Sequence, residues 1–255
     1  DELINVSAQP HSIYTCSKET LLKTKKIAEK YNLPIHIHIS EARQEVENSF
    51  KKNKKSPVKY LDDLGLLSGK TIAAHSVWLN DEDLVIYKKR DVKVSHNPIS
   101  NMKLASGIAP VNKMQEMKIT VGLGTDGAAS NNTLDLFDEM KVCALLHKVD
   151  KLDPTALSAR EVVRMSTIDA ARVLGMEDII GSLEVGKRAD IISINLDKPH
   201  LTPIYDPYSH IVYSANSGDV ENVVINGKII VRNRKSTTMN EEKILKKVNE
   251  FKIKN

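Results

Sequence analysis

The sequence has little of what nucleic-acid-binding, secreted and membrane-spanning proteins use. Only 4% of its 255 residues are aromatic, which argues against a surface that stacks nucleic-acid bases. It has only two cysteines, Cys16 and Cys143, with no paired spacing, which fits a reducing cytoplasm and argues against a disulfide. No apolar run approaches the roughly 18 residues of a membrane span. We therefore expect a cytoplasmic protein with no nucleic-acid or membrane partner.

What the sequence does contain is typical of a globular protein. Hydrophobic residues make up 41% and charged residues 27% of the chain, enough to bury a sizeable core. The net charge of +4 comes from scattered lysines, and we interpret the clusters at 51–55 and 243–254 as solvated helix faces and loops. The chain begins at Asp1 rather than methionine, so we expect it to be cut from a longer protein, and a leader before it stays open.

Strand-like and helical patterns alternate along the first two thirds of the chain. Apolar runs typical of buried strands lie at 3–8, 34–40, 71–75, 92–96 and 119–124. Helical patterns lie between them and after them, at 17–31, 42–50, 81–89, 111–116 and 133–148, and a further amphipathic helix is predicted at 158–174. This alternation predicts βα units around a parallel sheet.

The pattern changes near residue 189. Short alternating strands are predicted at 189–196, 210–214 and 220–231, with a hairpin turn at Asn226-Gly227. We interpret this region as part of a small β-sandwich. The predicted division is therefore a barrel-like part at 1–185, a β-sandwich part at 186–235 and a basic surface helix at 236–255.

Four strand ends carry residues that can bind metal or move protons. Apolar runs are followed by His11, His38 and His75, and a fourth run ends in Val-Gly-Leu-Gly-Thr-Asp-Gly, which brings Asp126 to a strand end. Histidine and aspartate are the residue types that a divalent metal and a hydrolytic proton shuttle require. Taken one at a time, each histidine could instead be a hydrogen-bonded core residue, and Asp126 could form a turn before Gly127.

Three longer motifs accompany these strand ends. They are Pro-His-Ser-Ile-Tyr-Thr-Cys at 10–16, Val-Ser-His-Asn-Pro-Ile-Ser-Asn-Met-Lys-Leu at 94–104 and Gly-Ser-Leu-Glu-Val-Gly-Lys-Arg-Ala-Asp at 181–190. Together with the strand ends they resemble the amidohydrolase superfamily, and within it the deaminases of 5-methylthioadenosine, S-adenosylhomocysteine and 5′-deoxyadenosine. The resemblance extends from about residue 4 to residue 231.

The resemblance implies a specific fold. The chain would supply the C-terminal five βα units, strands 4 to 8, of a (β/α)8 TIM-type barrel, together with part of the small β-sandwich domain. Five units are three short of a closed barrel, and an open fragment would expose a sheet edge. The family's first strands, with a His-x-His pair of metal ligands, would then lie in a missing N-terminal half of roughly 150 residues that completes the barrel. An open α/β sheet complete in itself is the alternative.

The resemblance also implies roles for five residues. His38 and Asp126 would bind the metal, and Asp126 would also pass a proton from water toward the leaving amine. Glu41 would protonate the ring nitrogen beside the attacked carbon, and His75 would stabilise the tetrahedral centre. The substrate would contact His11, Glu41 and Asp126. The alternatives are a helix N-terminal acid for Glu41, direct metal ligation or core packing for His75, and turn capping for His11.

The remaining histidines and the tryptophan receive lesser roles. His36 forms a His-x-His pair with His38, but in the matching strand of the family only the second histidine binds metal, so we expect a buried, hydrogen-bonded ring. His96 is expected to organise the metal ligands from outside. Ordinary structural positions are expected for His147, His200 and His210, and either a pocket wall or plain packing for Trp78.

The function implied is hydrolytic deamination of an adenine nucleoside to its inosine analogue and ammonia. The substrate would be S-adenosylhomocysteine, 5′-methylthioadenosine, 5′-deoxyadenosine or adenosine, with one divalent ion per full-length subunit, zinc or else iron. A homo-oligomer stays open. Alternatives are a triazine chlorohydrolase, a guanine or cytosine deaminase, or a metal-free binding or assembly protein. The metal-free protein is disfavoured because the four residues expected to carry the chemistry are intact, namely His38, Glu41, His75 and Asp126.

Overall fold

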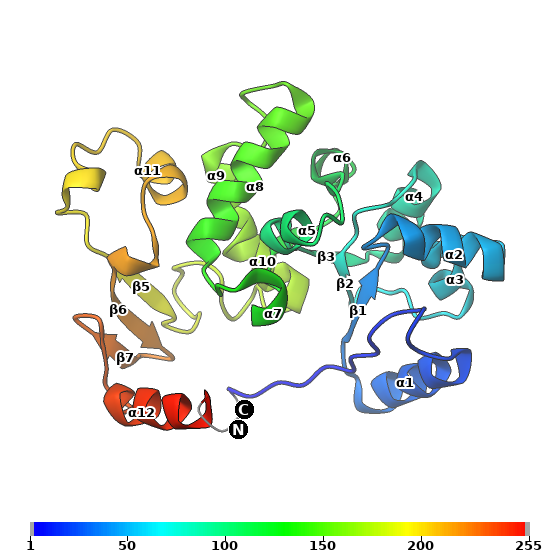
Figure 1. Ribbon diagram of the computed structural model, residues 1–255, viewed down its shortest axis with the longest axis horizontal. Coiled ribbons are helices and arrows are strands. Elements are labelled where there is room, and N and C mark those ends of the chain that lie inside the picture. Colours follow the sequence, from blue (N-terminus) through cyan, green and yellow to red (C-terminus); the bar gives the residue numbers. More distant parts are fainter. Residues whose placement is uncertain (1–2, 253–255) are drawn as a thin grey trace.

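Two sheets organise the part of the chain that the computed structural model describes, residues 3–252. The first has four parallel strands in the order β1-β2-β3-β4: β1 (Ile35–Ile39), β2 (Thr71–His75), β3 (Lys93–His96) and β4 (Val121–Leu123). The second is antiparallel and contains β5 (Ile191–Ile194), β6 (Val220–Ile225), β7 (Lys228–Arg232) and β8 (Lys235–Ser236). In Figure 1 the two sheets lie on opposite sides of the molecule, with helices between them.

The strand sequences explain how the parallel sheet is buried. In β1, Ile35, Ile37 and Ile39 are buried, while His36 and His38 alternate with them and project from the other face. β2 is buried at every position and pairs with β1 in a register that sets Ile39 opposite His75. Because all four strands are parallel, their carboxyl ends lie along one edge of the sheet.

Helices connect and cover these strands. In chain order they are α1 (Lys18–Tyr31), α2 (Arg43–Asn53), α3 (Pro57–Asp63), α4 (Asp81–Arg90), α5 (Pro98–Lys103), α6 (Val111–Glu116), α7 (Ala128–Asn131), α8 (Leu136–Lys151), α9 (Ala159–Met165) and α10 (Ile168–Leu174). Polar caps start several of them. Ser17 accepts a hydrogen bond from the Thr20 N–H, and Asn80 forms a reciprocal capping box with Asp83. The core lies between sheet and helices, with Leu21, Ile37, Tyr87 and Met114 fully buried.

The first predicted strand is wrong. Residues 3–8 contribute only an isolated parallel bridge from Ala8 to Ile35, and Leu3, Ile4 and Val6 are exposed. An apolar run forms a strand where its side chains pack on a half-buried surface, and in this segment Ala8 packs against the core whereas Leu3, Ile4 and Val6 are exposed. The first of the five predicted βα units therefore has its helix, α1, without a full strand.

One of the predicted helices is divided. The pattern at 133–148 corresponds to the single helix α8, whereas the pattern at 158–174 is interrupted at Ser166 and Thr167 between α9 and α10. The Thr167 hydroxyl donates to the Val163 carbonyl, and Thr167 has a non-helical backbone. Side-chain bonds of this kind compete with the helical ladder, which explains the break.

The second sheet contains one correct and one wrong prediction. Asn226 and Gly227 both have positive φ angles, 48° and 76°, and form the predicted hairpin turn between β6 and β7. Of residues 210–214, predicted as a strand, 210–213 lie in the helix α11 (Pro207–Tyr213), and Ser214 is its C-cap. Asp206 caps this helix and Pro207 starts it, a helix-start signal that outweighs the alternating pattern. The short helices η1 (Pro199–Leu201) and η2 (Ser217–Asp219) complete the region.

The chain ends in the helix α12 (Glu241–Lys252), close to the predicted C-terminal helix, of which residues 253–255 lie outside the described residues. Ile244, Leu245, Val248 and Phe251 are exposed on it. None of the helices in residues 3–252 has the length and apolar character needed to cross a bilayer.

Candidate metal and catalytic site

Three predicted residues meet at the carboxyl edge of the parallel sheet. His38 lies near the end of β1, His75 ends β2 and Asp126 lies three residues beyond β4. One potential ligand atom from each lies within 4.8 Å of the others. This spacing is compatible with a single ion, given metal–ligand bonds of about 2 Å.

His38 is oriented through its inner nitrogen. Its Nδ1 is 2.8 Å from the backbone carbonyl oxygen of His11, and the same loop is held by the His38 N–H, which donates to the same oxygen at 3.0 Å. A protonated Nδ1 leaves a lone pair on Nε2, the form of imidazole that binds a metal. The ring is half-buried, so it remains reachable from solvent.

His75 is buried and oriented in the same way. Its Nδ1 lies 2.8 Å from the Asn101 side-chain oxygen on α5, and its Nε2 lies 3.6 Å from the Glu41 carboxylate. The backbone of His75 has a φ of 68° and that of Ser76 a φ of 52°. Such left-handed geometry is uncommon outside glycine and is often kept at functional sites.

Asp126 is held as a carboxylate. The Ser100 hydroxyl donates to Oδ2 at 2.7 Å and the Gly127 N–H donates to Oδ1 at 2.8 Å. Partial burial raises the pKa of Asp126, but these hydrogen bonds and the nearby His75 outweigh it, so the pKa lies below its ordinary value. The group is therefore ionised near neutral pH and can bind a cation or accept a proton.

Glu41 and His11 border the same region. Glu41 follows the end of β1 with its side chain 17% exposed, and its carboxylate faces the His75 ring. His11 is exposed, and its ring lies 4.6 Å from that of His38, which in turn lies 5.2 Å from that of His75. The His11 Nδ1 is 2.9 Å from the Thr15 hydroxyl. The structure thus brings all five predicted residues to one edge of the sheet.

Comparison with known proteins assigns the chain to a family. Residues 1–230 match the model of the amidohydrolase family. The chain belongs to that family. The four parallel strands fit part of the barrel of an amidohydrolase.

Similar amidohydrolases are deaminases by name. A 5-methylthioadenosine/S-adenosylhomocysteine deaminase from Thermodesulfovibrio yellowstonii is 51% identical over 97% of this chain and 56% of its own length. A 5′-deoxyadenosine deaminase from Methanothermobacter thermautotrophicus is 48% identical over 96% of this chain and 57% of its own length. The chain thus spans little more than half the length of these relatives.

A solved structure agrees in fold. An adenosine deaminase from Xanthomonas campestris, crystallised with bound zinc, matches with a TM-score of 0.97 at 35% identity. The match covers 100% of this chain and 58% of the deaminase chain. The arrangement of the described elements is therefore that of an amidohydrolase.

A second group of potential metal ligands lies deeper in this amidohydrolase chain. His96, Cys143 and His147 are fully buried, and their ligand atoms lie within 4.8 Å of one another. The two rings share a 3.1 Å contact between their Nε2 atoms. Burial holds the pKa of His96 well below its ordinary value, lowers that of His147 to about 4 and raises that of the Cys143 thiol.

These donors would suit zinc, but the rings are not oriented for it. Neither the Nδ1 of His96 nor that of His147 has a hydrogen-bond partner among the described residues, whereas metal-binding histidines almost always donate their second N–H. We interpret the pair as two neutral core rings sharing one hydrogen bond. This agrees with a structural position for His147, and the ring contact of His96 is with His147 rather than with the candidate ligands.

His36 and His200 lie outside the candidate site. His36 is half-buried rather than buried and borders a cavity of about 140 Å³ with Ile72, Ser95 and Gly122. It belongs to neither ligand group among the described residues. His200 lies 3.0 Å from the buried carboxylate of Asp219.

Five residues that orient or brace the candidate site were not predicted. Ser100 and Asn101 contact Asp126 and His75, and lie in a motif whose sequence was noticed but not assigned. Glu45 accepts the Glu41 N–H at 2.9 Å. Glu139 accepts the Ile99 N–H and the Asn131 amide, and Asn131 also donates to the Thr125 carbonyl. Only Glu45 could be connected to the site from sequence spacing, because it lies four residues after Glu41 at the start of a predicted helix.

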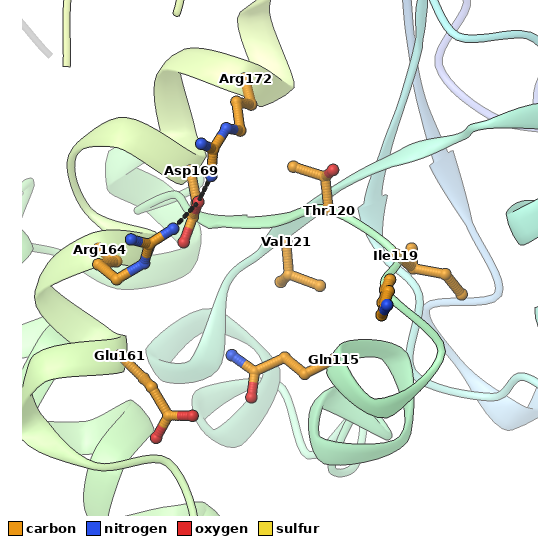
Figure 2. Close-up of a pocket in the computed structure, with 9 residues that line it drawn as sticks. Gln115, Ile119, Thr120, Val121, Glu161, Arg164, Asp169 and Arg172 are labelled. Atoms are coloured by element: carbon orange, nitrogen blue, oxygen red, sulfur yellow. Dashed lines mark hydrogen bonds and ion pairs between the residues drawn. The ribbon is translucent and has the colours of Figure 1, made fainter.

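A cavity of about 400 Å³ lies at the other end of β4. It is bordered by Thr120 and Val121 at the start of that strand and by residues of α9 and α10. Figure 2 shows Asp169 between Arg164 and Arg172, with ion-pair distances of 3.2 and 2.5 Å. Function in barrels lies at the carboxyl ends of the strands, so this cavity is separate from the candidate site.

Proposed function

We propose that this amidohydrolase chain carries the proton-transfer residues of a zinc-dependent deaminase. The reaction would convert S-adenosylhomocysteine, 5′-methylthioadenosine, 5′-deoxyadenosine or adenosine to the inosine analogue and ammonia. The observation that carries the proposal is the oriented group of His38, His75 and Asp126 with Glu41 3.6 Å from the His75 ring. The names of the relatives support adenine nucleosides as the substrate class.

The residues of the group fit a metal. His38 and Asp126 would hold one zinc ion, with iron as the alternative. The Nδ1 of His38 is bonded elsewhere, which leaves Nε2 available, and each Asp126 oxygen accepts one hydrogen bond and keeps a further lone pair. Bound zinc would supply Lewis-acid chemistry, making water acidic enough to attack near neutral pH.

The protein residues would divide the proton transfers among themselves. Water adds to the ring carbon that bears the amino group, and Asp126 takes its proton and returns it to the departing amine. Glu41 would donate a proton to the adjacent ring nitrogen, which makes the carbon a better electrophile. As the amine leaves and the new oxygen becomes a carbonyl, the remaining water proton would return to Glu41. His75 would hydrogen-bond the oxygen that develops at the tetrahedral carbon, and His11, at the exposed rim, would contact the nucleoside.

We also propose that the chain forms the C-terminal five βα units of the barrel, within residues 1–185, and a β-sandwich part at 186–235. The support is the match to little more than half the length of the relatives. The remaining length would supply a His-x-His strand with two further ligands. The full-length protein is this chain together with the N-terminal residues that would complete the barrel. A cytoplasmic location and a homo-oligomer remain predictions.

The proposal is tested by a deamination screen of the full-length protein. Adenosine, 5′-methylthioadenosine, 5′-deoxyadenosine, S-adenosylhomocysteine, guanine and cytosine are compared for ammonia release, with zinc and iron measured in the same preparation. We expect release from at least one adenine nucleoside and about one metal ion per subunit. Release from guanine or cytosine alone, or from none of the six, would reject the proposed substrate class.

A further inference from the structure

The turn that carries Glu41 is fastened by a second, buried glutamate. Glu45 lies in the first turn of α2, and only 5% of its surface is exposed. Its Oε1 accepts the Ser40 N–H at 3.0 Å and its Oε2 accepts the Glu41 N–H at 2.9 Å. Each carboxylate oxygen thus binds one of two consecutive peptide groups. Hydrogen bonds to a charged acceptor are among the stronger ones in proteins.

From this geometry we infer that Glu45 is a positioning residue, which sets the place of the Glu41 carboxylate without touching the substrate. The inference rests on the proposed function, because it concerns the residue to which that function assigns ring protonation. A merely structural helix cap is the alternative, since acidic side chains near a helix start often accept backbone N–H groups.

The backbone at this turn needs such a hold. Ser40 has a φ of 52°, in the left-handed region that a serine rarely adopts. Its carbonyl oxygen accepts the N–H groups of Val77 and Trp78, just beyond β2, at 3.1 and 2.9 Å. Ser40 is therefore bonded on one side to the β2 end that carries His75 and on the other to Glu45. Together these bonds fix the Glu41 backbone relative to both β1 and β2.

The burial of Glu45 is itself informative. Burial raises the pKa of Glu45 to about 7, although hydrogen bonds from the backbone of Ser40, Glu41 and Ala42 oppose the rise. A buried carboxylate without a cation is costly, and a helix cap can be made by an exposed side chain. Ala42, the N-cap of α2, makes no side-chain cap bond. The acid is thus placed where it holds the turn.

The test compares Glu45→Gln with the unchanged zinc-loaded full-length protein, using the adenine nucleoside that it turns over fastest. Glutamine keeps the size but presents its amide NH2, a donor that cannot accept, to one of the two N–H groups. Because small misplacements of a catalytic group cost large factors in rate, we expect kcat to fall about tenfold or more, with KM and zinc content within about twofold. The matched control is Glu47→Gln on the same helix, an exposed residue paired with Arg43, which should leave kcat unchanged.

A double-mutant cycle separates positioning from a structural role. If Glu45 acts through Glu41, adding Glu45→Gln to Glu41→Gln should cause no further loss of kcat. An equal loss in both backgrounds, or a wild-type kcat for Glu45→Gln, would overturn the inference. Slow kcat in Glu41→Gln together with normal kcat in Glu45→Gln would reject the inference and leave the proposed function standing.

A measurement on the unchanged protein covers the case in which Glu45→Gln does not fold. Hydrogen exchange of the Ser40 and Glu41 amides should be slowed at least as much as that of the amides within α2, because both N–H groups are bonded to a buried carboxylate. Exchange as fast as that of exposed loop amides would contradict the inference. Absence of deamination with every nucleoside would remove its foundation and would be recognised as failure of the function itself.

Discussion

This molecule has two groups of potential metal ligands: an outer group of His38, His75 and Asp126, and an inner group of His96, Cys143 and His147. Only the outer group has histidine rings oriented for a metal. In the outer group the Nδ1 atoms of His38 and His75 are each bonded to an oxygen at 2.8 Å. In the inner group the Nδ1 atoms of His96 and His147 have no partner in residues 3–252. Both groups have ligand atoms within the same 4.8 Å.

The difference shows that proximity of ligand atoms is a weak criterion. What distinguishes the outer group is that every side chain is oriented by a neighbour, which fixes the tautomer of each ring and leaves Nε2 available. The inner group has the same residue types in a dry core, where neutral rings and a protonated thiol are the stable forms. Substitution of a metal ligand in the outer group should therefore lower the zinc content, whereas substitutions in the inner group should leave it unchanged.

The largest effect is expected for Asp126→Asn in the full-length protein. The change removes a negative ligand and the proposed proton acceptor together, so we expect turnover to fall by about a thousandfold or more and zinc to be lost. Zinc content by atomic spectroscopy and ammonia release measure both quantities.

The inner group supplies the control for this experiment. Cys143→Ser changes a buried potential ligand of that group and should leave zinc content and turnover unchanged. Loss of zinc in Cys143→Ser with retention in Asp126→Asn would reverse our interpretation of which group binds metal.

The next effect separates proton transfer from metal binding. Glu41→Gln should lower kcat by roughly a hundredfold, the usual scale for a lost general acid, while zinc content stays near that of the unchanged protein. Glu47→Gln, six residues along the chain, is its control. A normal kcat would show that Glu41 is only an acid near a helix start.

A smaller effect tests the orientation of His75 directly. Asn101→Ala removes the oxygen that lies 2.8 Å from the His75 Nδ1, so the ring can turn or change tautomer. We expect kcat or zinc affinity to fall by about tenfold, the lower end of the usual range for losing a residue that orients a metal-site histidine. Asn112→Ala, on the neighbouring helix α6, serves as a control, and equal losses in both variants would indicate a general loss of stability.

Much of the site was predictable because it depends on where strands end. His38, His75 and Asp126 follow apolar runs whose period and length identify strands, and parallel strands bring their ends to one edge. The prediction of the first strand is wrong because Leu3, Ile4 and Val6 are apolar yet exposed, and an apolar pattern does not reveal whether its side chains are packed. Residues 210–214 were misjudged because a capping aspartate and a proline decided the structure instead.

Long-range partners were not predictable from spacing. The contact between His147 and His96 joins residues 51 positions apart, and Asn101 and His75 are 26 apart. Helical spacing does place Cys143 and His147 on one face of α8, but it does not tell which strand end that face meets. The contact between Glu45 and the Glu41 backbone was within reach of sequence reasoning, since the two residues are four positions apart.

The smallest expected effect concerns the pH dependence of stability in the inner group. Burial lowers the pKa of His147 from 6.5 to about 4, so between these values the unfolded chain binds more protons than the folded one. The free energy of unfolding therefore falls as the pH falls from about 6.5 to about 4. At about 1.4 kcal/mol per pKa unit the full shift sets an upper bound near 3 kcal/mol, and relaxation of the pair should reduce this to about 1 kcal/mol.

His147→Gln removes this titration while retaining an amide that can bond to His96. The variant should lose less stability than the unchanged protein between pH 7 and pH 4.5, measured by urea unfolding with a chelator present so that zinc release does not contribute. Turnover and zinc content at pH 7.5 should not change, because the ring lies outside the outer group. An identical loss of stability on acidification in both proteins would show that His147 is not held neutral by its burial, and a loss of zinc would return the inner group to consideration as a metal site.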